Sequence, residues 1–185
     1  MAKLIYSAFT SLDGYVADAN GNFDWAELDE EVFAVINDRE RRNGTYLLGR
    51  RMYETMAVGG TPDVIPDPTA AMLEYLPIWQ AADKIVYSTT LQSVSAANTR
   101  LKRAFDADAV RELKAGATRD IGVGGPALAA QAIRAGLVDE FHLLVAPIIA
   151  GGGNPYLPDQ VTVKLELLDE RSFDHGLVYL QYRAS

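Results

Sequence analysis

Two short stretches of this sequence combine glycine, charge and a change of hydrophobic period, as a phosphate-binding site requires. In residues 45–56 an apolar run suited to a buried strand ends at Gly49, and helical spacing follows from Arg51. A helix that begins there leaves its first backbone N–H groups unpaired at the positive end of the helix dipole, which attracts phosphate. We therefore expect Gly49, Arg50 and Arg51 to bind a phosphorylated ligand. The alternative is a tight turn beside two solvated arginines.

The second stretch, residues 120–128, repeats this arrangement. A short strand reaches Gly122, Gly124 and Gly125 and is followed by Pro126, a residue favoured in the first turn of a helix. Open α/β sheets bind ligands at the carboxyl ends of their strands, where both stretches would lie. Two helix ends at one edge suit the pyrophosphate of a dinucleotide.

A third strand pattern, at residues 84–87, is followed by Ser88, Thr89 and Thr90. An NAD site usually places an acidic residue after such a strand to bind the ribose, whereas a 2′-phosphate prefers hydroxyls and arginine. No acid stands here, so the sequence favours NADP over NAD. The alternative is that Ser88 and Thr89 only cap a turn.

Asp29, Glu30 and Glu31 are the candidate proton donors. The apolar spacing predicts a helix over residues 24–40, with Asp24 as its N-cap. On this helix Asp29 and Glu31 flank the apolar stripe while Glu30 points away, so the first two could line a pocket. A carboxyl partly buried there would have a raised pKa and could pass a proton to a substrate. The alternative is an ordinary solvated helix surface.

The composition excludes several other classes of protein. A length of 185 residues suits one domain spanning residues 1–185. The absence of cysteine removes disulfides, thiolate metal sites and cysteine nucleophiles, and favours a cytoplasmic protein. We expect no signal peptide and no membrane span. The net charge is −8 without any block of basic residues, which argues against a nucleic-acid partner. His142 and His175 lack metal-ligand spacing.

The order of the sequence patterns predicts the fold class. Strand-like and helix-like segments alternate along most of the chain, and two alternating strands over residues 163–182, joined at residues 174–176, close it. This order is typical of an α/β fold with a mostly parallel sheet and an antiparallel C-terminal hairpin. Residues 59–69, rich in proline and glycine, predict a surface loop that is either a lid or an inert connector.

Six motifs in a fixed order carry a family resemblance. They are residues 11–17, the helix with Trp25, and residues 48–54, 87–90, 122–128 and 136–140. Together they resemble the dihydrofolate reductase-like superfamily, and more closely its branch related to the reductase domain of bacterial riboflavin biosynthesis. The resemblance implies a three-layer fold with a central sheet of about eight strands, NADPH as the cofactor and a tendency to form homodimers.

The resemblance also implies roles for individual residues. In that family the two glycine stretches bind the NADPH pyrophosphate, the hydroxyls receive the 2′-phosphate, and the first loop lies against the nicotinamide. The positions that match are Gly49, Arg50, Arg51 and Met52; Ser88 and Thr89; Gly122, Gly124, Gly125, Ala127 and Leu128; and, in the loop, Asp13, Gly14 and Ala17. Counting from Trp25 as in dihydrofolate reductases selects Glu30 as the acid, whereas the helical-face argument selects Asp29 or Glu31.

The sequence therefore predicts an NADPH-dependent reductase. It would transfer hydride to a planar, pterin- or pyrimidine-like heterocycle or another conjugated small molecule, with Asp29, Glu30 or Glu31 as proton source. Two alternatives stay open. One is a riboflavin-pathway reductase of 5-amino-6-ribosylaminouracil phosphate, which would need cations such as Arg39, Arg41 and Arg42 turned inward. The other is a nucleotide-binding homologue without catalytic activity.

Overall fold

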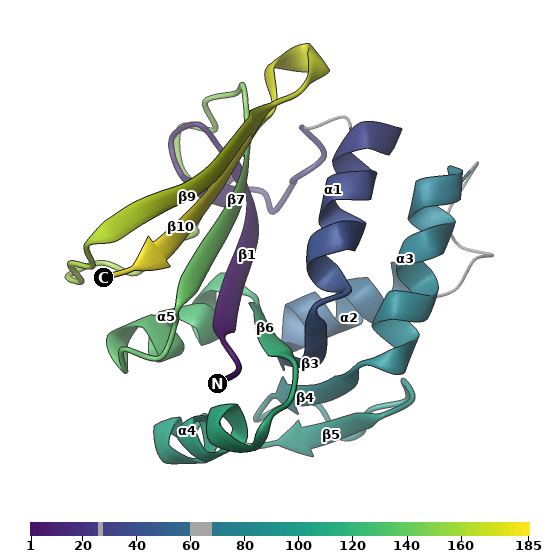
Figure 1. The fold of residues 1–185 in the computed structure, drawn as a ribbon, viewed down its shortest axis with the longest axis vertical. Coiled ribbons are helices and arrows are strands. Elements are labelled where there is room, and N and C mark those ends of the chain that lie inside the picture. Colours follow the sequence, from purple (N-terminus) through teal and green to yellow (C-terminus); the bar gives the residue numbers. More distant parts are fainter. Residues whose placement is uncertain (26–27, 60–67) are drawn as a thin grey trace.

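The chain folds around one eight-stranded sheet with the strand order β5-β4-β3-β6-β1-β7-β10-β9 (Figure 1). A computed structural model describes residues 1–25, 28–59 and 68–185. The strands of this sheet are β1 (Leu4–Ser11), β3 (Asn43–Gly49), β4 (Asp83–Tyr87), β5 (Thr99–Lys102), β6 (Asp120–Gly124), β7 (Glu140–Ala146), β9 (Leu165–Ser172) and β10 (Val178–Ala184). A small two-stranded sheet joins β2 (Tyr15–Ala17) to β8 (Asn154–Pro155).

The sheet is parallel except at one side. Strands β1 and β3 to β7 run parallel to one another, whereas β10 is antiparallel to both β7 and β9. The residues between β9 and β10 form the short 3-10 turn Asp174–Gly176. The predicted α/β fold, with about eight strands and an antiparallel C-terminal hairpin, is thereby confirmed.

Helices cover both faces of the sheet, which makes three layers. On one face α4 (Ala107–Gly116) and α5 (Pro126–Arg134) bury Val110 and Ile133 against sheet residues such as Leu47. On the other face lie α1 (Glu30–Glu40), α2 (Arg50–Gly59) and α3 (Ala70–Ala81), in two further apolar clusters. Apolar burial against the two faces is the main source of stability for such a sheet.

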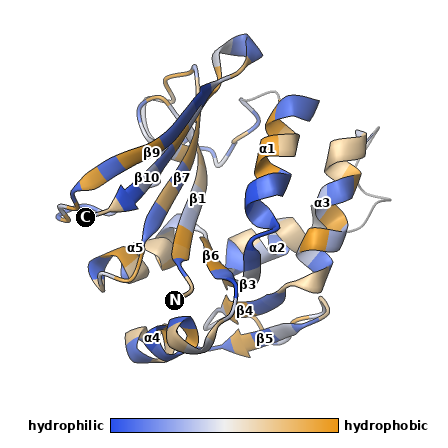
Figure 2. Ribbon diagram, viewed as in Figure 1, coloured by the Kyte–Doolittle hydropathy of each residue, from blue (hydrophilic) through white to orange (hydrophobic). Residues whose placement is uncertain are grey.

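Helix α1 begins later than its sequence pattern predicts. Its N-cap is Asp29, not Asp24, and the Asp29 carboxylate accepts a hydrogen bond from the Val32 N–H at 2.9 Å. Trp25 and Leu28 still pack against the cluster that α1 buries, but they do so from outside the helix. The predicted apolar stripe was therefore right and the predicted start was wrong. Figure 2 shows the first turn of α1 as hydrophilic and its middle as hydrophobic.

Helix α3 and strand β5 are absent from the sequence prediction. The α3 segment contains Pro77 and is apolar on nearly all sides, so it shows no stripe. Its C-terminal end is held by Lys84, a buried side chain whose ammonium donates to the carbonyl oxygens of Trp79 and Ala82 at 2.7 and 2.6 Å. These bonds satisfy carbonyl groups that a helix end leaves unpaired. Most of the predicted loop at residues 59–69 lies outside the described residues. No helix in the described ranges is long and apolar enough to cross a membrane.

Candidate functional site

The central strand β1 separates from β6 at the carboxyl edge of the sheet. It pairs with β7 over residues 5–11, but with β6 only over residues 4–6. The Lys3 carbonyl accepts from the Ile121 N–H of β6. Main-chain N–H and C=O groups point to alternate sides along a strand, so those of Phe9 point to the same side of β1 as those of Lys3. At Phe9, however, β6 no longer pairs with β1. Ser7 and Phe9 are only half-buried although they lie in the central strand.

The two glycine stretches predicted to bind phosphate meet at this edge. A Cβ atom added to Gly125 would lie 3.8 Å from Gly49 Cα and 3.6 Å from Met52 Cβ, and one added to Gly49 would lie 3.8 Å from the Gly124 carbonyl oxygen. Gly125 also has φ 93°, which other residues rarely adopt. The positive φ explains glycine at position 125, and the contact joins segments far apart in the sequence.

Helices α2 and α5 both start at this contact and continue on opposite faces of the sheet. The first N–H groups of each helix have no carbonyl partner within that helix, so two positive dipole ends meet at one edge. Arg50 and Arg51 are exposed on the first turn of α2. Arg50 lies 3.7 Å from Glu54, both with side chains 46% exposed, which is a weak surface ion pair that leaves the guanidinium accessible.

Ser88 caps the turn after β4, which is the alternative to a phosphate-binding role that the sequence left open. Its Oγ accepts from the N–H groups of Thr90 and Leu91 at 3.2 and 2.9 Å, while Thr89 is exposed. The sequence interpretation did not include Arg103, which follows β5 and donates to the carbonyl oxygens of Ser88 and Leu91 at 3.2 and 2.5 Å. An exposed cation thus stands beside the predicted 2′-phosphate position. Arg103 was missed from the sequence because the short β5, which places Arg103 next to the end of β4, was not recognised as a strand.

Two of the predicted cofactor-binding positions, Gly122 and Leu128, are placed less favourably. Gly122 is buried inside β6, where a Cβ would lie 2.9 Å from the Tyr46 ring, so packing alone explains this glycine. The Leu128 side chain is in the core, and its N–H donates to the Gly125 carbonyl at 3.2 Å. Ala127, in the first turn of α5, is exposed at the edge.

The loop after β1 is held against the glycine-rich loop after β7. Asp13 accepts hydrogen bonds from Ser11 Oγ at 2.7 Å and from the N–H groups of Ala150 and Gly151 at 2.9 and 2.8 Å. These bonds lower the pKa of the Asp13 carboxyl below its ordinary value. A Cβ on Gly153 would clash with the backbone around Ala17, so the two loops also touch directly. Asp13 therefore has a structural task at the site.

Gly14 also holds the loop after β1 against the segment that follows β7. This residue has φ 88°, and its carbonyl accepts from the Tyr156 N–H at 3.0 Å. Ala17 pairs with Asn154 in the small sheet of β2 and β8. The loop thus lies at the carboxyl end of β1, next to the split, in a fixed position.

The three candidate acids differ in exposure and direction. Glu30 and Glu31 are exposed on the first turn of α1, whereas Asp29 is half-buried. At 100° per residue, Asp29 lies on the side of α1 that carries Ile36, between the face that packs on the sheet and the face that packs on α3. Glu30 lies over α3 and Glu31 on the outer side. Of the three candidate acids, Asp29 is therefore the one that is half-buried and lies on the Ile36 side of α1.

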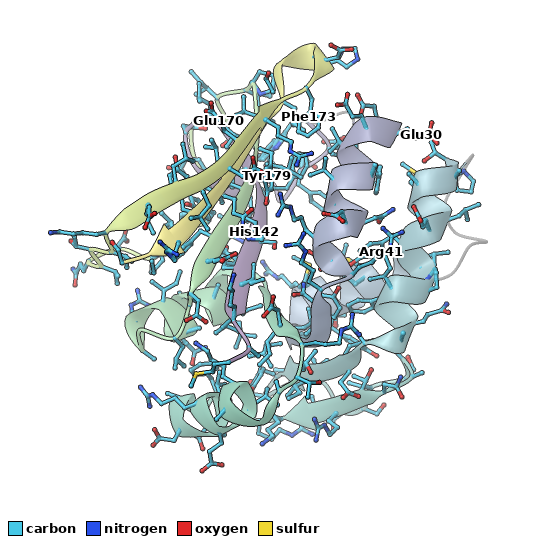
Figure 3. The ribbon with its side chains drawn as sticks, viewed as in Figure 1. Glu30, Arg41, His142, Glu170, Phe173 and Tyr179 are labelled. Carbon is cyan, nitrogen blue, oxygen red and sulfur yellow. The ribbon has the colours of Figure 1, made fainter. Side chains whose placement is uncertain are left out.

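A buried polar network lies under the C-terminal half of α1. His142, labelled in Figure 3, has its Nε2 3.1 Å from Glu140 Oε2. Glu140 also accepts from Lys3 Nζ at 2.6 Å and from Gln181 Nε2 at 3.0 Å. Burial acts to raise the pKa of Glu140, but these hydrogen bonds bring it below its ordinary value. Burial lowers the pKa of His142. His142, Glu140 and Gln181 are buried and hydrogen-bonded to one another through Glu140, so this network has a structural role.

This strand order and these layers define a dihydrofolate reductase-like α/β protein. The chain belongs to the RibD C-terminal domain family, whose model matches residues 2–179. Both levels of the predicted resemblance are thus confirmed.

Three known proteins show how far the similarity extends. The protein YyaP of Bacillus subtilis (strain 168), itself uncharacterized, is 26% identical over 182 residues, which cover 97% of this chain and 94% of YyaP. A pyrimidine reductase-like protein from Corynebacterium diphtheriae superposes with a TM-score of 0.71 at 16% identity, covering 100% of this chain and 92% of that one. Dihydrofolate reductase from Enterococcus faecalis, solved with NADP(H), gives 0.64 at 13% identity, covering 99% and 96%.

Proposed function

We propose that this protein is an NADPH-dependent reductase of a small planar molecule. The observation that carries the proposal is the meeting of two helix N-termini at Gly49 and Gly125, beside the split between β1 and β6. Membership of a family named for a riboflavin-biosynthesis protein, and the likeness to a dihydrofolate reductase solved with NADP(H), support the same reading.

The residues at this edge fit a dinucleotide phosphate. Helix N-termini and Arg50 and Arg51 suit a pyrophosphate, and Arg103 with the Thr89 hydroxyl suits a 2′-phosphate. The Phe9 main chain offers a donor and an acceptor to an amide group at the split. Bound there, NADPH would supply a hydride to the acceptor and leave as NADP⁺.

The proton that completes the reduction would come from Asp29. Its carboxylate is the half-buried one of the three candidates, and one of its oxygens is free of the capping bond to Val32. Asp29 would take a proton from water and pass it, directly or through a water molecule, to the atom that becomes basic as the hydride arrives. The acceptor would thereby gain a hydride from NADPH and a proton from Asp29, that is, two electrons and two hydrogens in all.

Thermal stability with NADPH or NADH tests the cofactor half of the proposal. Ligand at ~100 times its Kd adds about 2.7 kcal/mol to the free energy of unfolding. For a chain of 185 residues this corresponds to a rise in Tm of about 5 to 11 °C. We expect the rise with NADPH and little with NADH. No rise with either cofactor would refute the proposal.

Two other functions remain candidates, and the proposal also covers the localisation and the oligomeric state of the protein. Family membership keeps the riboflavin-pathway reductase of 5-amino-6-ribosylaminouracil phosphate as the second candidate. Cofactor binding without NADPH oxidation by any acceptor would favour the non-catalytic homologue. We also propose a cytoplasmic homodimer, as the resemblance implies, which light scattering on the purified protein and fractionation of cells would test.

A further inference from the structure

We infer that the acceptor reduced by this protein carries no phosphate and is a neutral or cationic planar ring. This inference rests on the proposed function, because it concerns the substrate of the same site. It is carried by the distribution of charge on the two sides of the split between β1 and β6.

The segment from β1 through α1 is strongly acidic. Residues 4–38 contain eight carboxylates and neither lysine nor arginine. The carboxylates are Asp13, Asp18, Asp24, Glu27, Asp29, Glu30, Glu31 and Asp38. Asp13 and Asp18 accept hydrogen bonds that lower the pKa of each, so both stay ionised at neutral pH. An incoming phosphate would therefore approach a segment of its own sign of charge.

The segments opposite carry few cations. Residues 135–163, which include β7 and the glycine-rich loop, contain no arginine or lysine. The β9–β10 turn carries Asp174 and His175, and the arginine before it, Arg171, lies 3.5 Å from Asp169. Phe173 and Leu177 of this turn share one buried cluster with Val32 of α1. The start of α1 and the β9–β10 turn are thus brought to the same end of the molecule, where Figure 3 shows Phe173 and Glu30.

The arginines of α1 do not supply the missing charge. Arg39 donates to Asp169 at 2.7 Å, with its side chain 14% exposed, and its guanidinium lies 5.5 Å from the centre of the Tyr179 ring. Arg41 pairs with Glu74. Arg39 lies in the last turn of α1 and Arg41 is its C-cap, and Figure 3 shows Arg41 at the end opposite Glu30. Both arginines are therefore paired with carboxylates and lie at the end of α1 away from the proposed acceptor site.

Among the described residues, four exposed cations lie on the other side of the split. Arg50 and Arg51 open α2, and Lys102 and Arg103 end or follow β5, which lies beyond β3 and β4 in the sheet. This is the side assigned to the cofactor phosphates. The acceptor side instead exposes apolar side chains at the loops: Leu12 is 66% exposed, Phe23 59% and Ile149 72%. Such side chains suit contact with an uncharged ring.

A matched pair of acceptors tests the inference. We would measure NADPH oxidation, at saturating NADPH, with 5-amino-6-ribosylaminouracil and with its 5′-phosphate, and their dissociation constants on NADP⁺-saturated protein by calorimetry. We expect the compound without phosphate to be favoured at least ~10-fold at low salt. Raising the ionic strength from about 20 to about 300 mM should improve only the phosphorylated compound, because salt screens repulsion.

Charge-reversal variants test the cause of this preference. Asp24→Lys combined with Asp174→Lys should narrow the preference at least ~3-fold, whereas Glu112→Lys, an exposed site on α4, should leave it unchanged. Equal use of the two compounds, a preference for the phosphorylated one, or an unchanged preference in the double variant would overturn the inference. These failures differ from failure of the proposed function, which would show as absence of NADPH binding.

Discussion

Replacing Asp29 separates the catalytic role proposed for this carboxylate from its structural role as the N-cap of α1. Its Oδ1 accepts from the Val32 N–H at 2.9 Å, so Asp29→Ala removes the bond as well as the carboxyl group. Asparagine caps helices about as well as aspartate but cannot deliver a proton at neutral pH. Comparing Asp29→Asn with Asp29→Ala therefore isolates the proton.

The expected magnitudes of the two effects are well separated. Loss of the cap costs about 1 kcal/mol, which for a chain of this length lowers Tm by roughly 2 to 4 °C. Asp29→Asn should keep Tm within about 2 °C of the parent, since the cap remains. If Asp29 is the proton source, both variants lose about 10²- to 10⁴-fold in kcat, or roughly 3 to 5 kcal/mol of transition-state stabilisation.

The assay is NADPH oxidation at saturating cofactor, with Tm and NADPH affinity measured on the same samples. Glu30→Gln and Glu31→Gln are the matched controls, because both residues are exposed on the adjoining turn. We expect each control to retain kcat within about 3-fold, well inside the ~10²-fold effect of a lost general acid. Full activity of Asp29→Asn, or a large loss in Glu30→Gln instead, would refute the assignment made from the face of α1.

Three further substitutions probe the cofactor edge and the core. Arg50→Ala should weaken NADPH binding by about 1.5 to 3 kcal/mol, or ~10- to 150-fold, and NADH less; unchanged titrations with both would contradict the phosphate contact. Gly125→Ala should destabilise by about 1 to 3 kcal/mol in urea titration because of its positive φ, while Gly116→Ala, with open space around it, should not. Burial lowers the pKa of His142 from its ordinary 6.5, so the stability it contributes is present above that pH and lost on acidification. His142→Gln should therefore flatten the fall in Tm between pH 6.5 and about 5, and an equally steep fall would count against this role.

Features encoded locally were predictable from the sequence. The strand-to-glycine-to-helix stretches at Gly49 and Gly125 depend on neighbouring residues only, and both occur as expected. The antiparallel hairpin follows from its own alternation and turn. The start of α1 was missed because Asp24 and Asp29 are both acceptable caps, and the local sequence does not select between them.

Features that depend on two distant segments were out of reach. The split at the carboxyl edge exists because β6 stops pairing while β1 continues beside β7, and no local pattern encodes where one strand outlasts another. Arg103 was missed for a related reason, since its position beside Ser88 requires β5 to pair with β4. For Gly122 the pattern suggested a ligand where the structure has the Tyr46 ring.

The split between β1 and β6 also separates the residues proposed to bind the cofactor from those proposed to bind the acceptor. The residues proposed for the cofactor come mainly from β3, β4, β5 and β6, and those facing the acceptor from β1, α1, β7 and the β9–β10 turn. Substitutions in separate blocks that share no contact usually have additive free energies. We therefore expect Arg50→Ala and Asp24→Lys to combine additively, the first changing NADPH affinity and the second acceptor preference. A double-mutant cycle with a coupling energy well above about 0.5 kcal/mol would show that cofactor and acceptor are recognised together, and the division would then be wrong.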